Sequence, residues 1–505
     1  MRNQELSKLP AGWVWGTLGQ ALPLSYGKGL TENQRDETGS VPVYGSSGVI
    51  GRHSHALTTG PTLIVGRKGS VGEVYFSPQP CWPIDTTYFV EATESTNLRF
   101  FAYLLRTAGL GRLDKSTAVP GLGRDDYNRI EVPIAPLPEQ QRIIRGLDEQ
   151  LARLDAAVVA LKRVQGNLKR YRGSVLKAAC EGRLVPTEAE LARAEGRDYE
   201  TGEQLLARIL KERRAKWEAD QLAKMRAAGK PPKDEKWKAK YPTPSASSDS
   251  DLSVQLEGWC AATLEQLTSA VRVICYGILM PKANIPDGVP YVRVKDLKGD
   301  AIDVPGLRKT SPEIADQYAR ASLRGGDLLL AIRGTFGRVA EVPDSLNGAN
   351  ITQDTARLDV HPDANHRYVA VHLRGAACQS YFKKVARGVA VKGVNIGDVR
   401  LTPIMLPPAV EQRRIVAEAE RRLSVIDEVE GLVEVGLKRA DRLRQAILTR
   451  AFEGKLVPQD PNDEPAGALL ERIGAERAKL DEAAKPAKGR MRRPSRRSAK
   501  TEIFA

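Results

Sequence analysis

The sequence predicts an α+β protein: two α/β domains joined by two long helices that form an intramolecular coiled coil. Three observations lead to this fold class. One stretch occurs twice at a constant spacing, each copy carries a heptad pattern of apolar residues, and each follows a longer segment of short β-type runs. The two halves of the chain are therefore expected to form a pseudo-two-fold repeat.

The repeat comprises residues 139–186 and 411–458, which stay 272 positions apart without a gap and agree at 15 positions. Both copies open on Glu-Gln, and they close on the similar motifs EGRLVP and EGKLVP. Looser similarities precede them: GWVWGTL at 12–18 is similar to GWCAATL at 258–264, and LIVGRKGSVG at 63–72 is similar to LLAIRGTFG at 329–337. Each half thus has a variable segment followed by a closely repeated one.

Each repeated segment predicts one long helix. Pro138 is a favourable start for the first, and Gly182 and Gly454 suit the left-handed residue that ends a helix. A helix of about 42 residues is ~63 Å long and is not stable alone in water. Pairing with its own repeat buries the apolar seam, although a long core helix or a homodimer zipper would also do so. The seam consists of Ile144, Leu147, Leu151, Leu154, Val158, Leu161, Leu168 and Val175, and of Val416, Ala419, Leu423, Ile426, Val433, Leu437, Ala440 and Ile447.

The variable segments predict short strands broken by Gly, Pro, Asn and Asp. TLIVGRKGSVGEVYF and DLLLAIRGTFGRVAEV each suggest a strand, a glycine-bearing turn and a second strand. Helices are expected at 98–110 and 366–382. A further polar helix, from about residue 201, precedes a linker rich in Pro, Lys and Ser.

The formal net charge of +15 favours an anionic partner such as nucleic acid, since clustered Lys and Arg release counterions from phosphates. The surplus is largest, at +7, in residues 139–250. Residues 485–500 add eight basic side chains without an acidic one, which is typical of a disordered tail. Composition does not indicate which surface binds the partner.

Several classes of protein and site are not expected. The five cysteines are scattered, which favours reduced, structural thiols, and His53 and His55 have no partner that would make a metal site. There is no phosphate-binding loop and no Asn-Pro-Pro-aromatic motif of an amino-methyltransferase. No apolar run approaches the ~18 residues of a membrane span, so a cytoplasmic protein is expected.

These motifs together resemble the specificity subunits of type I restriction-modification systems. PLPEQQRII and EQRRIV open the paired helices, EGRLVP and EGKLVP close them, and VPVYGSSGVIG and RGTFG fall in two target-recognition domains. The resemblance covers nearly the whole chain, and it implies that the intramolecular coiled coil is antiparallel, with one recognition domain at each end. Together with the shifts in composition, it divides the chain into target-recognition domain 1 at 1–138, spacer helix 1 at 139–186, a polar helix and linker at 187–250, target-recognition domain 2 at 251–410, spacer helix 2 at 411–458, and a C-terminal helix with a basic disordered tail at 459–505. The basic tail is not part of the family's pattern.

The resemblance implies a non-catalytic subunit that recognises a bipartite, asymmetric sequence of double-stranded DNA, one half per domain. It also implies two modification (methyltransferase) subunits that hold S-adenosylmethionine and methylate adenine, and restriction subunits that use ATP and Mg. No cofactor is expected in this chain. A stiff helical spacer gives this scheme a physical reason, because it would fix the distance between two half-sites.

DNA contacts are expected in glycine-bearing loops, which bring polar side chains and the backbone close to base edges and phosphates. The same glycines would also occur in tight turns without a DNA-binding role. AVPGLGRDDY at 118–127 and GVAVKGVNIGD at 388–398 occupy matching places in the two halves. The candidates are Ser46, Ser47, Arg67, Lys68, Ser70, Arg124, Arg333, Thr335, Lys392 and Asn395.

The two helix starts share Gln140, Arg142, Gln412 and Arg414 at matching positions. Equal residues cannot distinguish unequal half-sites, so these four are assigned to a partner interface, with internal packing as the alternative.

Two other functions are compatible with the pattern. A coiled-coil scaffold would show no DNA sequence preference. A metal-dependent endonuclease is suggested loosely by Asp287, Asp296 and Lys298 in PDGVPYVRVKDLK.

Overall fold

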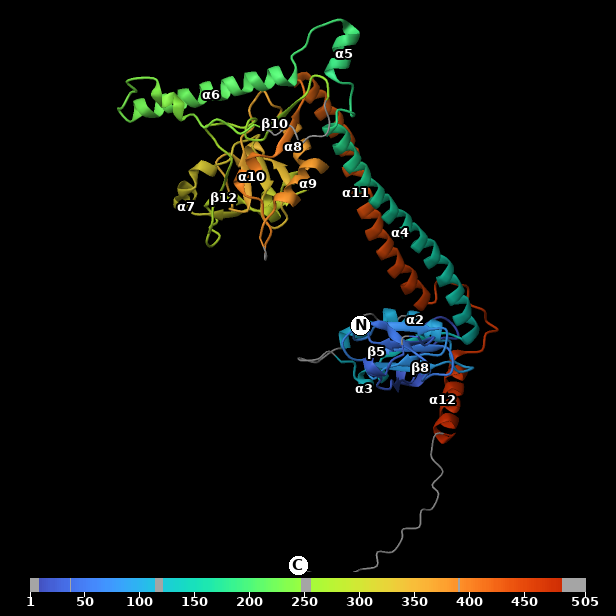
Figure 1. Ribbon diagram of the computed structural model, residues 1–505. Coiled ribbons are helices and arrows are strands. Elements are labelled where there is room, and N and C mark those ends of the chain that lie inside the picture. The colour runs from blue at the N-terminus through green and yellow to red at the C-terminus, as the bar shows by residue number, and fades with distance from the viewer. Residues whose placement is uncertain (1–8, 37, 114–120, 247–255, 389–390, 484–505) are drawn as a thin grey trace, which may run out of the picture. The chain divides into compact units, whose positions relative to one another are not determined.

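The structure, a computed structural model, describes residues 9–36, 38–113, 121–246, 256–388 and 391–483 (Figure 1). The chain divides into two compact units, one made of Met1–Leu161 and Val435–Ala505, the other of Lys162–Glu434. Each unit combines a β-rich domain with one part of each long helix, α4 (Leu137–Cys180) and α11 (Ala409–Phe452). The predicted α+β fold class is confirmed. The basic stretch 485–500 lies outside the described residues.

The first unit has three small sheets. Their strand orders are β2-β8-β5-β6, β4-β3-β7 and β1-β9, and the pairs are antiparallel except β3 with β7. The predicted hairpin is the β5–β6 pair, and the predicted helix is α2. The elements are β1 (Val14–Thr17), α1 (Leu18–Ala21), β2 (Ser25–Tyr26), η1 (Glu32–Gln34), β3 (Val41–Gly45), β4 (Gly48–His53), β5 (Thr62–Gly66), β6 (Val74–Ser77), β7 (Trp82–Pro83), β8 (Thr87–Glu91), α2 (Leu98–Thr107), η2 (Leu110–Leu113), α3 (Arg124–Asn128), β9 (Glu131–Ile134) and α12 (Ala466–Ala483).

The second unit repeats these sheets as β11-β19-β16-β17, β15-β12-β18 and β10-β20, and it adds the small β13-β14 pair. The β12–β18 pair is again the parallel one. Its elements are α5 (Glu188–Glu195), α6 (Gly202–Ala227), η3 (Lys236–Lys240), β10 (Cys260–Thr263), β11 (Cys275–Tyr276), β12 (Val289–Val292), η5 (Val294–Asp296), β13 (Leu297–Lys298), β14 (Ala301–Ile302), η6 (Val304–Gly306), β15 (Arg308–Thr310), α7 (Pro312–Gln317), η7 (Ala319–Ala321), β16 (Leu328–Ala331), β17 (Val339–Glu341), η8 (Asp344–Leu346), β18 (Asn350–Ile351), β19 (Thr355–Leu358), α8 (His366–Arg374), α9 (Ala376–Val385), α10 (Ile396–Arg400) and β20 (Pro403–Leu406).

The spacing of 272 residues extends beyond the sequence repeat. It relates α3 to α10, β9 to β20 and α4 to α11, with the same limits at both ends of every element. Sequence similarity reveals the constant spacing only for residues 139–186 and 411–458, which contain the long helices. The strands and the short helix keep it because their backbone hydrogen bonds do not depend on which side chains they carry.

Most of the predicted heptad seam is buried where the two long helices pair within each unit, while Val158, Leu161, Leu168 and Leu437 are half-buried. In the first unit Leu151 and Leu154 belong to the same core as Ala440 and Ile447. In the second unit Val175 belongs to one core with Leu423 and Ile426. Burying an apolar side chain of this size stabilises the fold by roughly 1.5–3 kcal/mol, which explains why the amphipathic helices pair.

Symmetric ion pairs support the antiparallel arrangement. Arg172 pairs with Asp427 in the second unit, and Arg444 pairs with Asp155 in the first. Arg444 is the repeat equivalent of Arg172, and Asp427 is that of Asp155, each 272 positions later. The same arginine and aspartate positions therefore pair in both directions between the two copies. Only an antiparallel pairing of the two copies allows this.

Both long helices end as the sequence predicts. Gly182 and Gly454 follow α4 and α11 with φ of 64° and 66°, in the left-handed region that glycine adopts without a Cβ penalty. The first helix begins at Leu137, one residue before the predicted Pro138.

Two expectations for the second unit need correction. The helix predicted at 366–382 is two helices, α8 and α9, because the chain turns at Gly375, where an added Cβ would lie 2.6 Å from the Cys180 sulfur. Part of the predicted linker folds back onto α6, since Trp237 stacks on Trp217 with ring centroids 6.1 Å apart.

Candidate nucleic-acid interface

The loop after the central strand has the same backbone in both domains. In the first, the amide of Gly72 donates to the carbonyl of Gly66 (2.9 Å); in the second, the amide of Gly337 donates to that of Ala331 (2.8 Å). The turn glycines Gly69, Gly72, Gly334 and Gly337 all have φ between 69° and 87°. Residues 66–72 therefore correspond to 331–337 without a gap, so Lys68 is the counterpart of Arg333 and Ser70 that of Thr335.

A second loop lies beside this one in each domain. The amide of Leu122 donates to the carbonyl of Arg67, and the amide of Val394 donates to that of Ile332, both at 2.8 Å. Isolated β-bridges join Lys68 to Gly121 and Arg333 to Gly393. The two glycine-bearing segments of each half, which are far apart in the sequence, thus form one surface.

In the first domain this surface carries arginine stacked on tyrosine. The Arg67 guanidinium lies 5.0 Å from the ring centre of Tyr26 and 5.7 Å from that of Tyr88, and Arg124 lies 5.6 Å from Tyr26. Arg67 also donates to the carbonyl of Asp85 (3.0 Å). These contacts hold two guanidiniums at the surface while their remaining N–H groups stay available to a ligand.

The serine candidates adjoin the same loop. Ser46 approaches it, since a Cβ built on Gly69 would lie 3.4 Å from the Ser46 hydroxyl. Ser47 is exposed in the turn between β3 and β4. The structure therefore brings Ser46, Arg67, Lys68, Ser70 and Arg124 together around two loops, with Ser47 in the adjoining turn.

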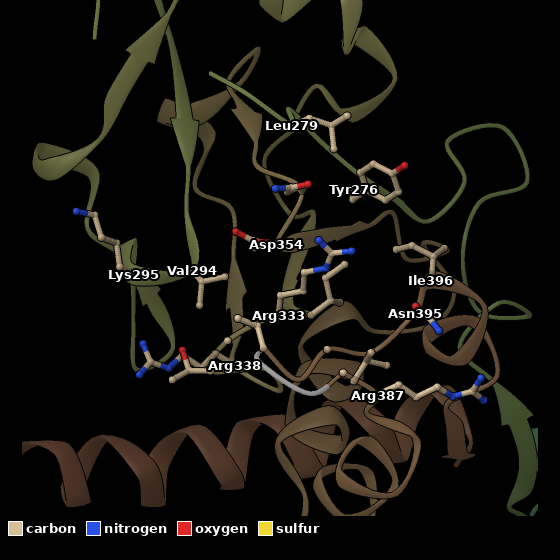
Figure 2. A pocket seen from close by; sticks show the side chains of 18 of the residues that line it. Tyr276, Leu279, Val294, Lys295, Arg333, Arg338, Asp354, Arg387, Asn395 and Ile396 are labelled. Carbon is tan, nitrogen blue, oxygen red and sulfur yellow. The ribbon is translucent and has the colours of Figure 1, made fainter. Parts of the chain in front are cut away.

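In the second domain the equivalent surface borders a groove with a volume of about 1040 Å³. Figure 2 shows Arg333 in the middle of this groove, with Lys295 and Arg338 on one side and Asn395 and Arg387 on the other. Thr335 and Asn395, both exposed, also line it. The side chain of Lys392 is exposed, and the backbone carbonyl of Lys392 accepts from the amide of Gly334 (3.3 Å).

The groove offers both hydrogen-bond donors and acceptors. Among the described residues that line it, five are basic: Lys295, Lys298, Arg333, Arg338 and Arg387. The same described lining has one carboxylate, Asp354, and two primary amides, Gln353 and Asn395. Arg and Lys suit guanine, Asn and Gln suit adenine, and Asp accepts from cytosine. An excess of cations favours phosphate binding at the same surface.

Sequence reasoning missed several of these residues. Lys295 and Lys298 lie in the segment that suggested a nuclease, while Arg387 and the Gln353–Asp354 pair lie between predicted elements. No local motif marks them, because only the folding of the second domain brings them to Arg333. Two tyrosines beside these loops, Tyr26 and Tyr276, do carry a local signal, because each is followed by glycine.

The shared helix-start residues have internal contacts. Gln140 and Gln412 are fully buried, and each donates to the carbonyl five residues earlier at 2.9 Å. Arg142 pairs with Asp463 (2.6 Å), and Arg414 pairs with Glu188 (2.6 Å). These contacts are of the kind that the packing alternative would make, and the two glutamines are covered within their domains.

Two buried carboxylates brace the same helix starts. Glu139 accepts from the indole N–H of Trp13, and Glu411 accepts from that of Trp259, both at 2.9 Å. Burial raises the pKa of both carboxyl groups, against the lowering effect of these hydrogen bonds. Each long helix is thus fastened to the domain that precedes it.

The segment that loosely suggested a metal-dependent nuclease does not leave Asp296 free to bind a metal. Asp296 is buried and accepts three hydrogen bonds from Arg293, at 2.7–2.9 Å. Among the described residues one group has metal-like geometry: Glu212, His361 and Asp363. Arg208 already pairs with Asp363 there, so the carboxylate is neutralised by a protein cation. The rings of His53 and His55 are 5.8 Å apart, and neither histidine belongs to that group.

Comparison with known proteins decides the family. Residues 10–157 and 281–424, together more than half of the chain, match the family described as type I restriction modification DNA specificity domain. The chain belongs to this family. The two matched segments fall in the two β-rich domains and the parts of α4 and α11 that follow them.

Curated relatives agree with this assignment. The specificity subunit of the Escherichia coli type I restriction enzyme EcoBI is 29% identical over 430 residues, covering 82% of this chain and 80% of the relative. That of EcoDI, also from Escherichia coli, is 24% identical over 497 residues, covering 93% and 96%. The chain is thus a non-catalytic specificity subunit with two recognition domains.

A solved structure has the same fold. A chain from work on complex assembly and conformational transition of the type I R-M system superposes with a TM-score of 0.58 at 17% identity, covering 89% of this chain and 99% of that one. No described helix of the present chain is long and apolar enough to cross a membrane.

Proposed function

We propose that this specificity subunit recognises a bipartite, asymmetric DNA sequence, with one half bound by each recognition domain. One observation carries the proposal: the two domains present the same pair of hydrogen-bonded loops but different side chains on them. A common frame suits a common ligand, and unlike side chains suit unlike half-sites.

The side chains of the two surfaces favour different base contacts. We assign DNA contacts in the first domain to Ser46, Ser47, Arg67, Lys68, Ser70 and Arg124. In the second domain we assign them to Arg333, Thr335, Lys392 and Asn395, and we add Gln353, whose amide both donates and accepts, and Asp354, which accepts. A guanidinium can bind guanine through two hydrogen bonds, whereas a lysine ammonium acts as a point charge, so the equivalent positions 68 and 333 differ in discriminating power.

The long helices act, in this proposal, as the spacer between the half-sites. Each has 44 residues, or ~66 Å at 1.5 Å per residue. Inserting one heptad into both helices preserves the seam and lengthens each by ~10.5 Å. We expect the variant to prefer a target whose spacer is longer by about three base pairs of 3.4 Å, and an unchanged spacer would contradict this role.

The partners follow from the family. We propose that two modification subunits carrying S-adenosylmethionine bind the chain and methylate adenine, and that restriction subunits using ATP and Mg join them in the cytoplasm. The internal repeat supports two equivalent attachment sites. Arg142 and Arg414 lie at equivalent, partly exposed positions, and we retain them as candidate edges of those sites.

The decisive experiment is methylation mapping. The chain is co-expressed with its modification partner and a plasmid, and methylated adenines are located by sequencing. We expect one bipartite motif with unlike halves. Absence of any such motif would overturn the proposal and favour the scaffold alternative, while magnesium-dependent cleavage by the purified chain would favour the endonuclease.

A further inference from the structure

Tyr26 and Tyr276 occupy the same place in the two domains. Tyr26 is the second residue of β2 and pairs with Tyr88 on β8, and Tyr276 is the second residue of β11 and pairs with Ala356 on β19. Tyr88 pairs in turn with Val65 on β5, and Ala356 with Leu330 on β16, the strands that lead into the candidate loops. The match rests on backbone pairing, because the surrounding sequences differ.

The glycine after each tyrosine fixes its position. A Cβ on Gly27 would lie 2.0 Å from the carbonyl oxygen of Ile84, and one on Gly277 would lie 2.0 Å from that of Ile351. Only glycine allows this approach. The next residue donates to the neighbouring segment in both domains: Lys28 to the carbonyl of Pro83 at 3.0 Å, and Ile278 to that of Ile351 at 2.7 Å.

Both rings remain open to solvent although their backbone is held. Tyr26 is 51% exposed and Tyr276 is 36% exposed. Tyr276 lines the groove around Arg333 (Figure 2), and Tyr26 stacks on Arg67. A large aromatic side chain that is fixed, exposed and beside cations is suited to contact a ligand at low entropic cost.

The surroundings of the two tyrosines are unlike. Ile332 takes the place of Arg67, Ile396 takes that of Arg124, and Arg320 lies 5.6 Å from the Tyr276 ring. The Tyr-Gly pair is thus the same in the two domains, whereas the side chains around it differ. A residue common to both domains cannot distinguish unlike half-sites, but it can contact what both half-sites share, which is the sugar–phosphate backbone.

We propose that Tyr26 and Tyr276 are equivalent, sequence-independent contacts to the DNA backbone, in which each hydroxyl donates to a phosphate oxygen and each ring packs on deoxyribose. The inference rests on the proposed function, because it requires the two loops to face DNA. It assigns the two tyrosines to affinity and the differing loop side chains to specificity.

The test uses the complete complex of this chain with its modification partner, with Tyr26→Ala and Tyr276→Ala made singly. Two fluorescent duplexes are titrated by anisotropy, one with the mapped motif and one with both halves scrambled. We expect each variant to bind both duplexes roughly ten-fold more weakly, as for loss of a hydrogen bond to a charged group. The methylated motif should stay unchanged.

Tyr171→Ala is the matched control, since Tyr171 is 47% exposed and belongs to α4 and not to either pair of loops. It should bind both duplexes like the native complex. An equal loss in this control would overturn the inference, because the effect would then belong to assembly. Tyr26→Phe and Tyr276→Phe separate ring from hydroxyl and should recover part of the affinity.

The other outcomes are equally distinct. Native affinity in both alanine variants, with unchanged melting temperatures, would overturn the inference. A relaxed base at one position of the motif would also overturn it, because the tyrosine would then contact a base edge. If the native complex methylates no motif, the proposed function itself fails before any variant is compared.

Discussion

The two recognition domains share a backbone frame and differ in the side chains mounted on it. The frame consists of main-chain hydrogen bonds between two loops, at nearly the same distances in both domains. Such bonds do not require particular side chains, so the loops can exchange residues without losing their shape. Position 67 illustrates the freedom: an arginine stacked on two tyrosines in the first domain corresponds to the buried Ile332 in the second. The backbone thus sets the shape of the two loops, and the side chains set what each surface offers to a ligand.

The largest expected effect concerns the frame itself, at Gly72 and Gly337. Both have positive φ, which costs a non-glycine residue about 1–2 kcal/mol. A Cβ on Gly72 would also lie 2.6 Å from the backbone nitrogen of Gly111, whereas one on Gly337 would meet the end of the Gln379 side chain at 2.5 Å. Backbone cannot move aside as a side chain can. We expect Gly72→Ala to destabilise its domain by about 2–4 kcal/mol and Gly337→Ala by less.

Thermal unfolding of the two variants in parallel checks this order, and hydrogen exchange shows which loop loosens. Gly334→Ala is the control, because its φ is 69° but an added Cβ would have open space. It should show the conformational cost alone. Equal destabilisation by all three changes would contradict this order. It would mean that the backbone at Gly111 shifts at little cost to make room for the new Cβ on residue 72.

The next effect separates the two half-sites. Arg333→Ala should relax one half of the methylated motif and Lys68→Ala the other, since the two residues are structural equivalents on different domains. We expect a loss of discrimination of about 1–3 kcal/mol for Arg333 and less for Lys68, because only the guanidinium can bind a base through two hydrogen bonds. Methylation mapping measures the change, and circular dichroism verifies folding. Both variants relaxing the same half would break the assignment of one domain to each half-site.

A smaller effect compares the buried carboxylates at the helix starts. Glu411 accepts hydrogen bonds through both oxygens, from the indole of Trp259 and the amide of Glu188, each at 2.9 Å. The second oxygen of Glu139 is buried without a partner among the described residues. Glu411→Gln turns an N–H toward a donor and should cost about 1–2 kcal/mol, while Glu139→Gln should cost less.

The pH dependence of these variants has a defined sign. Burial raises the pKa of both carboxyl groups above the ordinary 4.5, so the native fold is favoured while they are protonated and loses that contribution as the pH rises through the raised pKa. The glutamine variants cannot ionise. Their melting temperature relative to native should therefore increase from about pH 4.5 upward, and a flat difference would show that the groups titrate as in the unfolded chain.

Much of the fold was predictable because its signals are periodic. The heptad seam, the constant spacing and the terminal glycines gave the two helices to within a few residues, and alternation with glycine turns gave both central hairpins. The break between α8 and α9 was not predictable, because it arises where Gly375 meets Cys180, nearly two hundred residues earlier in the chain.

The candidate interface was predictable only in its loops. Arg67, Lys68 and Arg333 follow strong strand patterns and adjoin glycines, so local sequence marks them. Local sequence does not mark their neighbours. Arg387 reaches the groove because Gly393, to which it is bridged, is also bridged to Arg333, and Asp354 reaches it because its carbonyl accepts from the amide of Ile332. The gapped alignment of 63–72 with 329–337 also needed correction, since hydrogen bonds align residues 63–72 with 328–337 without a gap.

The smallest expected effect tests the symmetry of the coiled coil. Arg172 contacts both Asp427 and Glu430, the latter at 3.0 Å, whereas its counterpart Arg444 contacts Asp155. Exposed ion pairs contribute roughly 0–1 kcal/mol each. Arg172→Ala should therefore lower the free energy of unfolding slightly more than Arg444→Ala, and salt should reduce both effects. A double-mutant cycle in urea isolates each pair. Equal losses for Arg172→Ala and Arg444→Ala would mean that Glu430 adds nothing, and the helices would then be energetically as symmetric as their register.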